Sequence, residues 1–209
     1  MKDQVERYVH ELCAEFDRIN WSDKRIYGAY CAQVYYYVRH STRLLGFGAG
    51  LMPLVDQMAH QRFGAHIIEE KNHELLALKD CEALGFKVDE FLELPSTKAF
   101  YMTQYHMALH KTPWALLGYI LILEGLAVNK CLQFHDQVTK LHGPKCATFM
   151  KVHGEEDEDH FPQAVKLCES RPDFERAAIL ESAEISAYLH RMMLRDLQNA
   201  MRLSLRKVA

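Results

Sequence analysis

Residues 151–162 read KVHGEEDEDHFP and contain three polar side chains with helical spacing. His153, Asp157 and His160 stand at i, i+4 and i+7. On an α-helix these positions lie at about 0°, +40° and −20° around the axis, so they share one face. Two imidazoles and a carboxylate on one face are suitable ligands for a transition metal. The stretch therefore predicts a helix that forms one side of a metal site.

A second segment repeats this spacing earlier in the chain. Residues 66–73 read HIIEEKNH, which places His66, Glu70 and His73 at i, i+4 and i+7. Each segment contains a carboxylate three residues before a histidine, a unit that helical bundles use to bind pairs of metal ions. We therefore expect the two segments to face each other across one site.

Glu124 is the most obvious further carboxylate, because it lies in an otherwise apolar segment. Burying a lone carboxylate without compensation is costly, so Glu124 must be paired, protonated or bound to a metal. Mixed imidazole and carboxylate ligation favours iron or manganese, with zinc as an alternative.

Helical periodicity and Gly/Pro punctuation predict an all-α fold. About seven helices joined by short turns are typical of a compact helical bundle, and the length suits a single domain over residues 1–209. The expected helices are 2–18, 23–45, 53–84 (interrupted at Gly64 and ended by Gly85), 95–111, 114–142, 144–169 and 172–206.

Composition excludes several classes of protein. A net charge of −3 without a basic block gives no electrostatic basis for nucleic-acid binding. The charged, amphipathic N-terminus is not a secretory signal. The apolar run 113–128 is short for a membrane span and suits a buried core helix, so we expect no membrane partner. A basic, amphipathic last helix is compatible with a homodimer.

Six cysteines without a C-x-x-C pair or framework spacing indicate reduced thiols. Reduced thiols are typical of a cytoplasmic protein, where they serve mostly as small core residues.

A tyrosine-rich segment provides candidate catalytic residues. Tyr30 and Tyr37 are seven residues apart and share a helical face, from which they can line a pocket or supply a proton or an electron. The alternative is packing of the rings with their hydroxyl groups at the rim of the core. Arg39 can bind a substrate carboxylate in a bidentate manner, or lie on the surface.

Three segments together resemble the heme-oxygenase-like di-iron oxidases, a family in the superfamily of thiaminase II and pyrroloquinoline-quinone synthase. They are AHIIEEKNHELLALKDCEALG (65–85), LEGLA (123–127) and the H-x3-D-x2-H motif at 153–160. The resemblance extends over roughly residues 25–200 and implies a heme-oxygenase-like helical bundle. The third motif is the most specific of the three.

The resemblance also implies a set of ligands for two ferrous ions, with manganese as an alternative metal. These ligands are His73, Glu124, His153, Asp157 and His160. A further family carboxylate lies either seven residues before the first histidine, at His66, or three before it, at Glu70. We favour Glu70 as this ligand, with His66 as an additional ligand or a neighbour of the site.

The activity that the resemblance implies is oxidation of a small organic substrate with O2 as co-substrate. Substrates in the family are usually amines, amino acids or fatty acids. One alternative is a thiaminase-II-like hydrolase on the same fold, which needs an activated cysteine such as Cys131 or Cys31. Another is a helical metal-binding protein without enzymatic activity.

Overall fold

The computed structural model describes the backbone of residues 1–206 and the side chains of residues 1–155 and 161–199. This part of the chain contains nine α-helices and three short 3-10 helices, and the all-α prediction is confirmed. The α-helices are α1 (Lys2–Phe16), α2 (Lys24–Val38), α3 (Ser41–Leu51), α4 (Gln57–Glu69), α5 (His73–Ala83), α6 (Pro95–His110), α7 (Leu116–His142), α8 (Thr148–Glu169) and α9 (Asp173–Arg206). The 3-10 helices are η1 (Leu54–Asp56), η2 (Val88–Glu90) and η3 (Pro113–Ala115).

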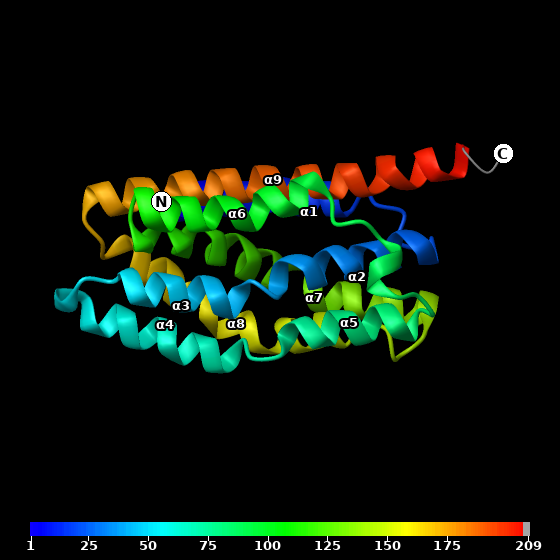
Figure 1. Cartoon of the computed structure of the whole chain (residues 1–209), viewed down its shortest axis with the longest axis horizontal. Helices are drawn as coiled ribbons and strands as arrows, with labels where there is room; N and C mark the ends of the chain where they lie inside the picture. Colours follow the sequence, from blue (N-terminus) through cyan, green and yellow to red (C-terminus); the bar gives the residue numbers. More distant parts are fainter. Residues whose placement is uncertain (207–209) are drawn as a thin grey trace.

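Helix α7 forms the centre of the bundle and packs against α1, α8 and α9 (Figure 1). Its N-terminal half is apolar on nearly every side, as expected for a helix surrounded by others. The helical segment Pro113–His142 is long and apolar enough to span a membrane, but 67% of its most apolar window is buried inside the bundle. The segment is therefore the core helix that the sequence predicts.

The expected helix 23–45 is divided into α2 and α3. It begins as predicted, because the Asp23 carboxylate accepts hydrogen bonds from the backbone N–H groups of Arg25 and Ile26 at 2.9 and 3.2 Å. It ends at Val38, and the glycine-rich residues 46–50, which lie between two of the expected helices, are part of α3. Glycine at position 48 allows close packing of α3 and does not mark a turn. An added Cβ there would lie 2.5 Å from Leu116 and 2.8 Å from Phe63.

The expected helix 53–84 is divided as well, at a different place from the one predicted. Gly64 lies inside α4, and the interruption falls between Glu70 and Asn72. Asn72 adopts a left-handed conformation with φ of 70°, which turns the chain before α5 begins. The predicted end at Gly85 is confirmed by its φ of 80°. These two divisions account for nine helices instead of about seven.

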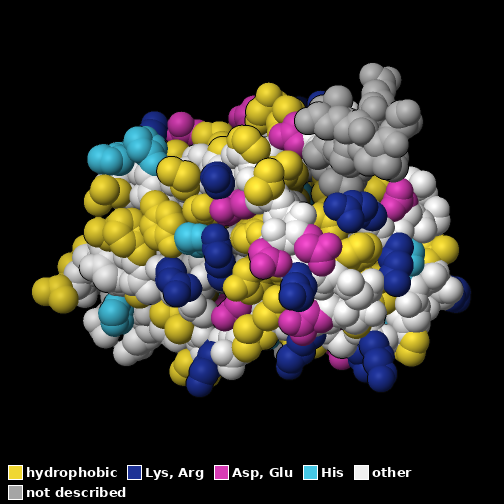
Figure 2. All heavy atoms as spheres, turned by 45° about the vertical axis from the view of Figure 1, so that its right-hand side comes forward, with side chains coloured by type: hydrophobic (Ala, Val, Ile, Leu, Met, Phe, Trp, Pro, Cys, Tyr) yellow, Lys and Arg dark blue, Asp and Glu magenta, His cyan; other side chains and the backbone are white. Residues whose placement is uncertain are grey.

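The described surface carries both signs of charge. In Figure 2, lysine and arginine side chains alternate with aspartate and glutamate over the face shown. Over its described residues this face has no continuous basic region, which agrees with the small net charge of −3.

All six cysteines are free and buried. Burial raises the pKa of Cys13 to about 11 and the pKa values of Cys81 and Cys168 to about 12. These thiols are therefore protonated core side chains, as the sequence predicts of reduced cysteines.

His190 of α9 is a fully buried histidine inside the bundle. Its ring lies edge-on to Phe100 and Tyr37, with centroids 5.3 and 5.9 Å apart. Neither ring nitrogen has a hydrogen-bond partner among the described residues. Burial lowers the pKa of His190 to about 4, so the ring is neutral in the folded protein.

This burial predicts a loss of stability in mild acid. The unfolded chain binds a proton at His190 near pH 6.5, whereas the folded chain binds it near pH 4, so stability is lost as pH falls through this window. We expect His190→Leu to reduce the fall in unfolding free energy between pH 6.5 and 4 by about 3 kcal/mol. Urea denaturation at both pH values measures this. An equal fall in unfolding free energy in the variant and the original protein would contradict the prediction. The control is His10→Leu, which replaces an exposed histidine.

At Gly118 the backbones of α7 and α9 approach each other closely. An added Cβ would lie 2.1 Å from the Ile179 carbonyl oxygen and 2.6 Å from the Ala183 nitrogen. We expect Gly118→Ala to lower the unfolding free energy by roughly 2–3 kcal/mol, because backbone atoms must move. Gly64→Ala is the control, since nothing lies within 4 Å of its Cβ position. That variant should gain about 0.5–1 kcal/mol from helix propensity. Urea denaturation compares the two, and equal effects would contradict the prediction.

Candidate metal centre

Three predicted ligands converge in the interior of the bundle. Glu70 follows the last residue of α4, His73 is the first residue of α5, and His153 lies in α8. One ligand atom from each lies within 4.8 Å of the other two, and all three side chains are partly buried. The two sequence segments therefore face each other, as expected.

The interruption between α4 and α5 changes how the first segment reaches the site. His66, Glu70 and His73 do not lie on one continuous helix, as was predicted. They still meet at the Glu70 carboxylate, whose two oxygens lie 3.7 Å from His66 Nε2 and 3.8 Å from His73 Nδ1. The turn at Asn72 thus preserves the contact that a continuous helix would have made.

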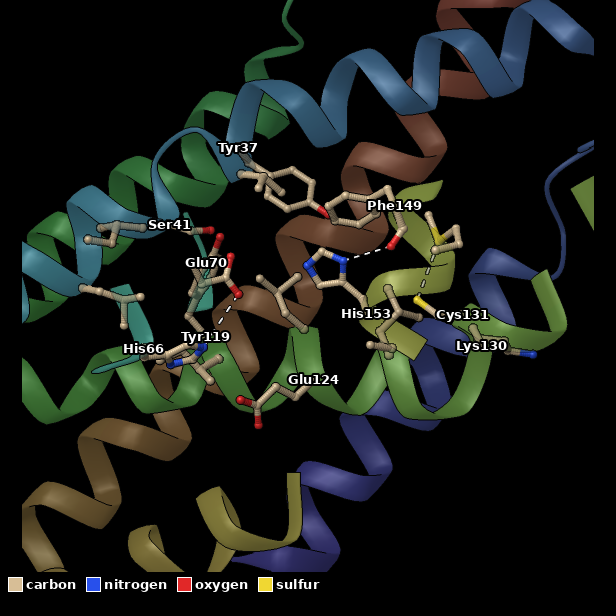
Figure 3. Close-up of a pocket in the computed structure, with 18 of the residues that line it drawn as sticks. Tyr37, Ser41, His66, Glu70, Tyr119, Glu124, Lys130, Cys131, Phe149 and His153 are labelled. Carbon is tan, nitrogen blue, oxygen red and sulfur yellow. Dashed lines mark hydrogen bonds and ion pairs between the residues drawn. The ribbon is translucent and has the colours of Figure 1, made fainter. Parts of the chain in front are cut away.

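His153 has a defined orientation and tautomer. Its Nδ1 lies 2.9 Å from the carbonyl oxygen of Phe149, one helical turn earlier. A carbonyl oxygen only accepts hydrogen bonds, so Nδ1 carries the proton and Nε2 carries the lone pair. In Figure 3 the other ring nitrogen points toward Glu70. Metal-binding histidines are commonly oriented by such a hydrogen bond.

The charges around Glu70 favour its ionised form. Burial alone would raise its pKa, but the ion pair with His66 and the electrostatic attraction of the neighbouring His153 and His73 lower it further than burial raises it. The pKa of His66 is raised in turn: burial opposes this, but the ion pair with Glu70 and the nearby Glu124 charge outweigh burial. The Glu70 carboxylate is therefore anionic at neutral pH.

The donor set suits iron. Two imidazoles and one carboxylate form the combination by which many non-heme ferrous sites are held. Glu70, His73 and His153 supply it from three separate segments, and their atoms are close enough to contact one ion.

Of the remaining predicted ligands, Glu124 is described and buried. It lines the same cavity as Glu70 and His153. Figure 3 shows its carboxylate pointing away from both. The side chains of Asp157 and His160 lie outside the described residues. The structure thus brings together Glu70, His73 and His153, with His66 against Glu70, and places Glu124 on another side of the cavity.

Tyr30 and Tyr37 both line this cavity from α2. Burial raises the pKa of both phenols well above the ordinary value, so each keeps its proton. Tyr30 also packs in an aromatic cluster, with its ring 5.7 Å from Phe16 and 5.1 Å from Trp21. The predicted position at a pocket is therefore observed, while their catalytic role stays a prediction.

One residue that positions the site was missed in the sequence. Asp80 of α5 is buried, and one of its oxygens accepts hydrogen bonds from Thr148 N and Oγ1 at 2.8 and 2.6 Å. The other accepts the Phe149 N–H at 2.9 Å. Asp80 thereby caps the N-terminus of α8, although it belongs to another helix. Its spacing of seven residues from His73, which places both on one face of α5, was the available signal.

The fold and site define an all-α bundle with a histidine and carboxylate cluster in its interior. The family model described as iron-containing redox enzyme matches residues 28–191, and the chain belongs to this family. A search of curated proteins found no match.

Two solved structures are similar in fold. One is a domain of unknown function with a heme oxygenase-like fold from Shewanella denitrificans OS217, at 17% identity and a TM-score of 0.84. The alignment covers 95% of this chain and 92% of that one. The other is a TenA homologue from Pseudomonas syringae pv. tomato DC3000, at 13% identity and a TM-score of 0.70, covering 94% and 92%. The predicted heme-oxygenase-like fold is confirmed.

Asp80→Asn tests the link between the two ligand-bearing helices. An amide has one acceptor oxygen in place of two, so one of the three hydrogen bonds is lost. We expect the unfolding free energy to fall by about 2–3 kcal/mol and ferrous iron to bind at least tenfold more weakly. Urea denaturation and anaerobic iron titration measure the two effects.

The matched control is Tyr27→Phe. It removes the hydrogen bond of 2.7 Å from the Tyr27 hydroxyl to the Cys146 carbonyl, just before α8, and leaves the cap intact. This variant should lose about 1 kcal/mol of stability and keep its iron affinity. Unchanged iron binding by the Asp80 variant would mean that the cap only stabilises the fold.

Proposed function

We propose that this protein is a non-heme iron oxidase or oxygenase that uses O2 to oxidise a small organic substrate. The observation that carries the proposal is the convergence of Glu70, His73 and His153 beside an interior cavity. Membership of a family described as iron-containing redox enzymes supports the choice of iron.

We further propose a centre of two ferrous ions, with manganese as an alternative. Glu70, His73 and His153 would hold one side of it. The remaining ligands would be Glu124, Asp157 and His160, with His66 as a ligand or as the partner that orients Glu70. Ferrous iron in this centre would supply electrons for the reduction of O2.

The chain itself contributes orientation and exclusion of water. The Phe149 carbonyl fixes the tautomer of His153, so that Nε2 is available as a ligand without rearrangement. The aromatic and aliphatic walls of the cavity keep bulk water from a substrate held there. Tyr37 keeps its hydroxyl proton, so its phenol can donate a hydrogen bond to a substrate group in the cavity.

Anaerobic loading with ferrous iron tests the proposal. We expect about two irons per chain, and O2 uptake that increases when a suitable substrate is added. His153→Ala should lower the affinity for iron at least tenfold. His106→Ala, which removes an exposed histidine of α6, is the control and should change neither measurement. Iron binding without O2 uptake across candidate substrates would contradict the oxidase and favour a metal-binding protein.

A TenA-like hydrolase is the second candidate. Its support is the fold shared with the TenA homologue and the position of Cys131 in the wall of the same cavity. The Cys131 thiol lies against the Met150 sulfur at 3.6 Å. Hydrolysis that is independent of iron and lost in Cys131→Ser would favour this candidate over the oxidase.

A further inference from the structure

The cavity beside the metal centre has mainly apolar walls. Its volume is about 80 Å³, which is room for a short alkyl chain. Five rings line it, from α1, α2, α7 and α8, and aliphatic side chains of α3 and α7 complete the wall. The rings belong to Phe16, Tyr30, Tyr37, Tyr119 and Phe149. Such a wall favours an alkyl or aryl group.

The carboxylates of the cavity are already engaged. Glu70 contacts His66 and His73, and Glu70 and Glu124 are both proposed metal ligands. A metal ion bound there would neutralise their charge. The phenols of Tyr30 and Tyr37 keep their protons and carry no negative charge. An ammonium group in this cavity would therefore be buried without an anionic partner among the described residues, which is costly.

The lysine and arginine side chains considered as partners for a substrate anion are already paired with carboxylates. Lys130 is the one lysine or arginine among the described lining residues, and its Nζ lies 2.7 and 2.6 Å from the two carboxylate oxygens of Asp17. Figure 3 shows this amine pointing away from the cavity. Arg39, a predicted partner for a substrate carboxylate, does not line the cavity and pairs with Glu93 at 3.6 Å. An anionic group on a substrate would therefore depend on the metal for its partner.

We propose that the substrate places an apolar alkyl or aryl group in this cavity and carries no ammonium group there. The inference rests on the proposed function, and it narrows the substrate to apolar molecules whose polar group, where present, is neutral or anionic. Amino acids and amines are excluded, because the two carboxylates in the wall, Glu70 and Glu124, would be occupied by the metal.

Two matched pairs of probes test this proposal. Hexanoate and norleucine share a carbon chain and a carboxylate and differ by one ammonium group, and 1-hexanol and hexylamine form a second pair that differs in charge. Isothermal titration is performed on the protein loaded with ferrous iron under anaerobic conditions, so no turnover occurs. We expect hexanoate and 1-hexanol each to bind at least tenfold more tightly than the ammonium-bearing partner. Equal binding, the reverse preference or no binding of either pair would overturn the proposal.

Variants of adjacent residues locate the binding. Ala127 lines the cavity, and Ala127→Leu should weaken hexanoate binding at least tenfold by filling it. Val128 is 44% exposed, and Val128→Leu should change binding less than twofold. Leu123→Phe is a second filling variant for use if the first does not fold. Undiminished binding in a folded filling variant would place the probe elsewhere and overturn the proposal.

The experiments distinguish failure of this inference from failure of the proposed function. A protein that binds iron but consumes no O2 contradicts the oxidase, while the preference within each pair is still measurable on the iron-loaded protein, because the titration is anaerobic. Tighter binding of norleucine and hexylamine contradicts only the apolar substrate and leaves the oxidase intact.

Discussion

The carboxylate of Asp80 is the interaction on which the geometry of the site depends. It joins α5 to the first turn of α8 through three hydrogen bonds between 2.6 and 2.9 Å. Ala147, which precedes α8, provides no side-chain cap of its own. His73 and His153 each lie within about two turns of this junction, so the cap sets the register of the two helices and the separation of the two imidazoles.

The turn at Asn72 and the hydrogen bond of His153 both direct polar side chains toward partners inside the bundle. A histidine or carboxylate in a bundle interior must be directed at a partner, because unpaired polar groups are costly there. The turn directs Glu70 at two histidines, and the Phe149 carbonyl directs His153 at Glu70. Apolar side chains around this group exclude water, which strengthens each of these electrostatic contacts.

Local signals in the sequence predicted much of the fold. Asp23, Pro95 and Gly85 each act on neighbouring backbone atoms, so the helix ends they predict are observed. The two expected helices are divided at 39–40 and 70–72 by packing between distant segments. Helical periodicity in the sequence carries no information about that packing. The spacing of His66, Glu70, His73 and His153 predicted the cluster. The direction of Glu124 and the role of Asp80 depend on the relative placement of whole helices, and no single segment encodes that.

The buried cysteines have a consequence for the durability of the proposed O2-dependent enzyme. Partly reduced oxygen species attack the thiolate form of cysteine, and attack requires access. Cys131 lines the cavity, but the other five thiols lie away from it, and burial raises the pKa of each, that of Cys13 to about 11 and that of Cys168 to about 12. The fold thereby keeps these five thiols in the form least susceptible to the oxidants that the proposed reaction would generate. Oxidation of these buried thiols would require local opening of the bundle.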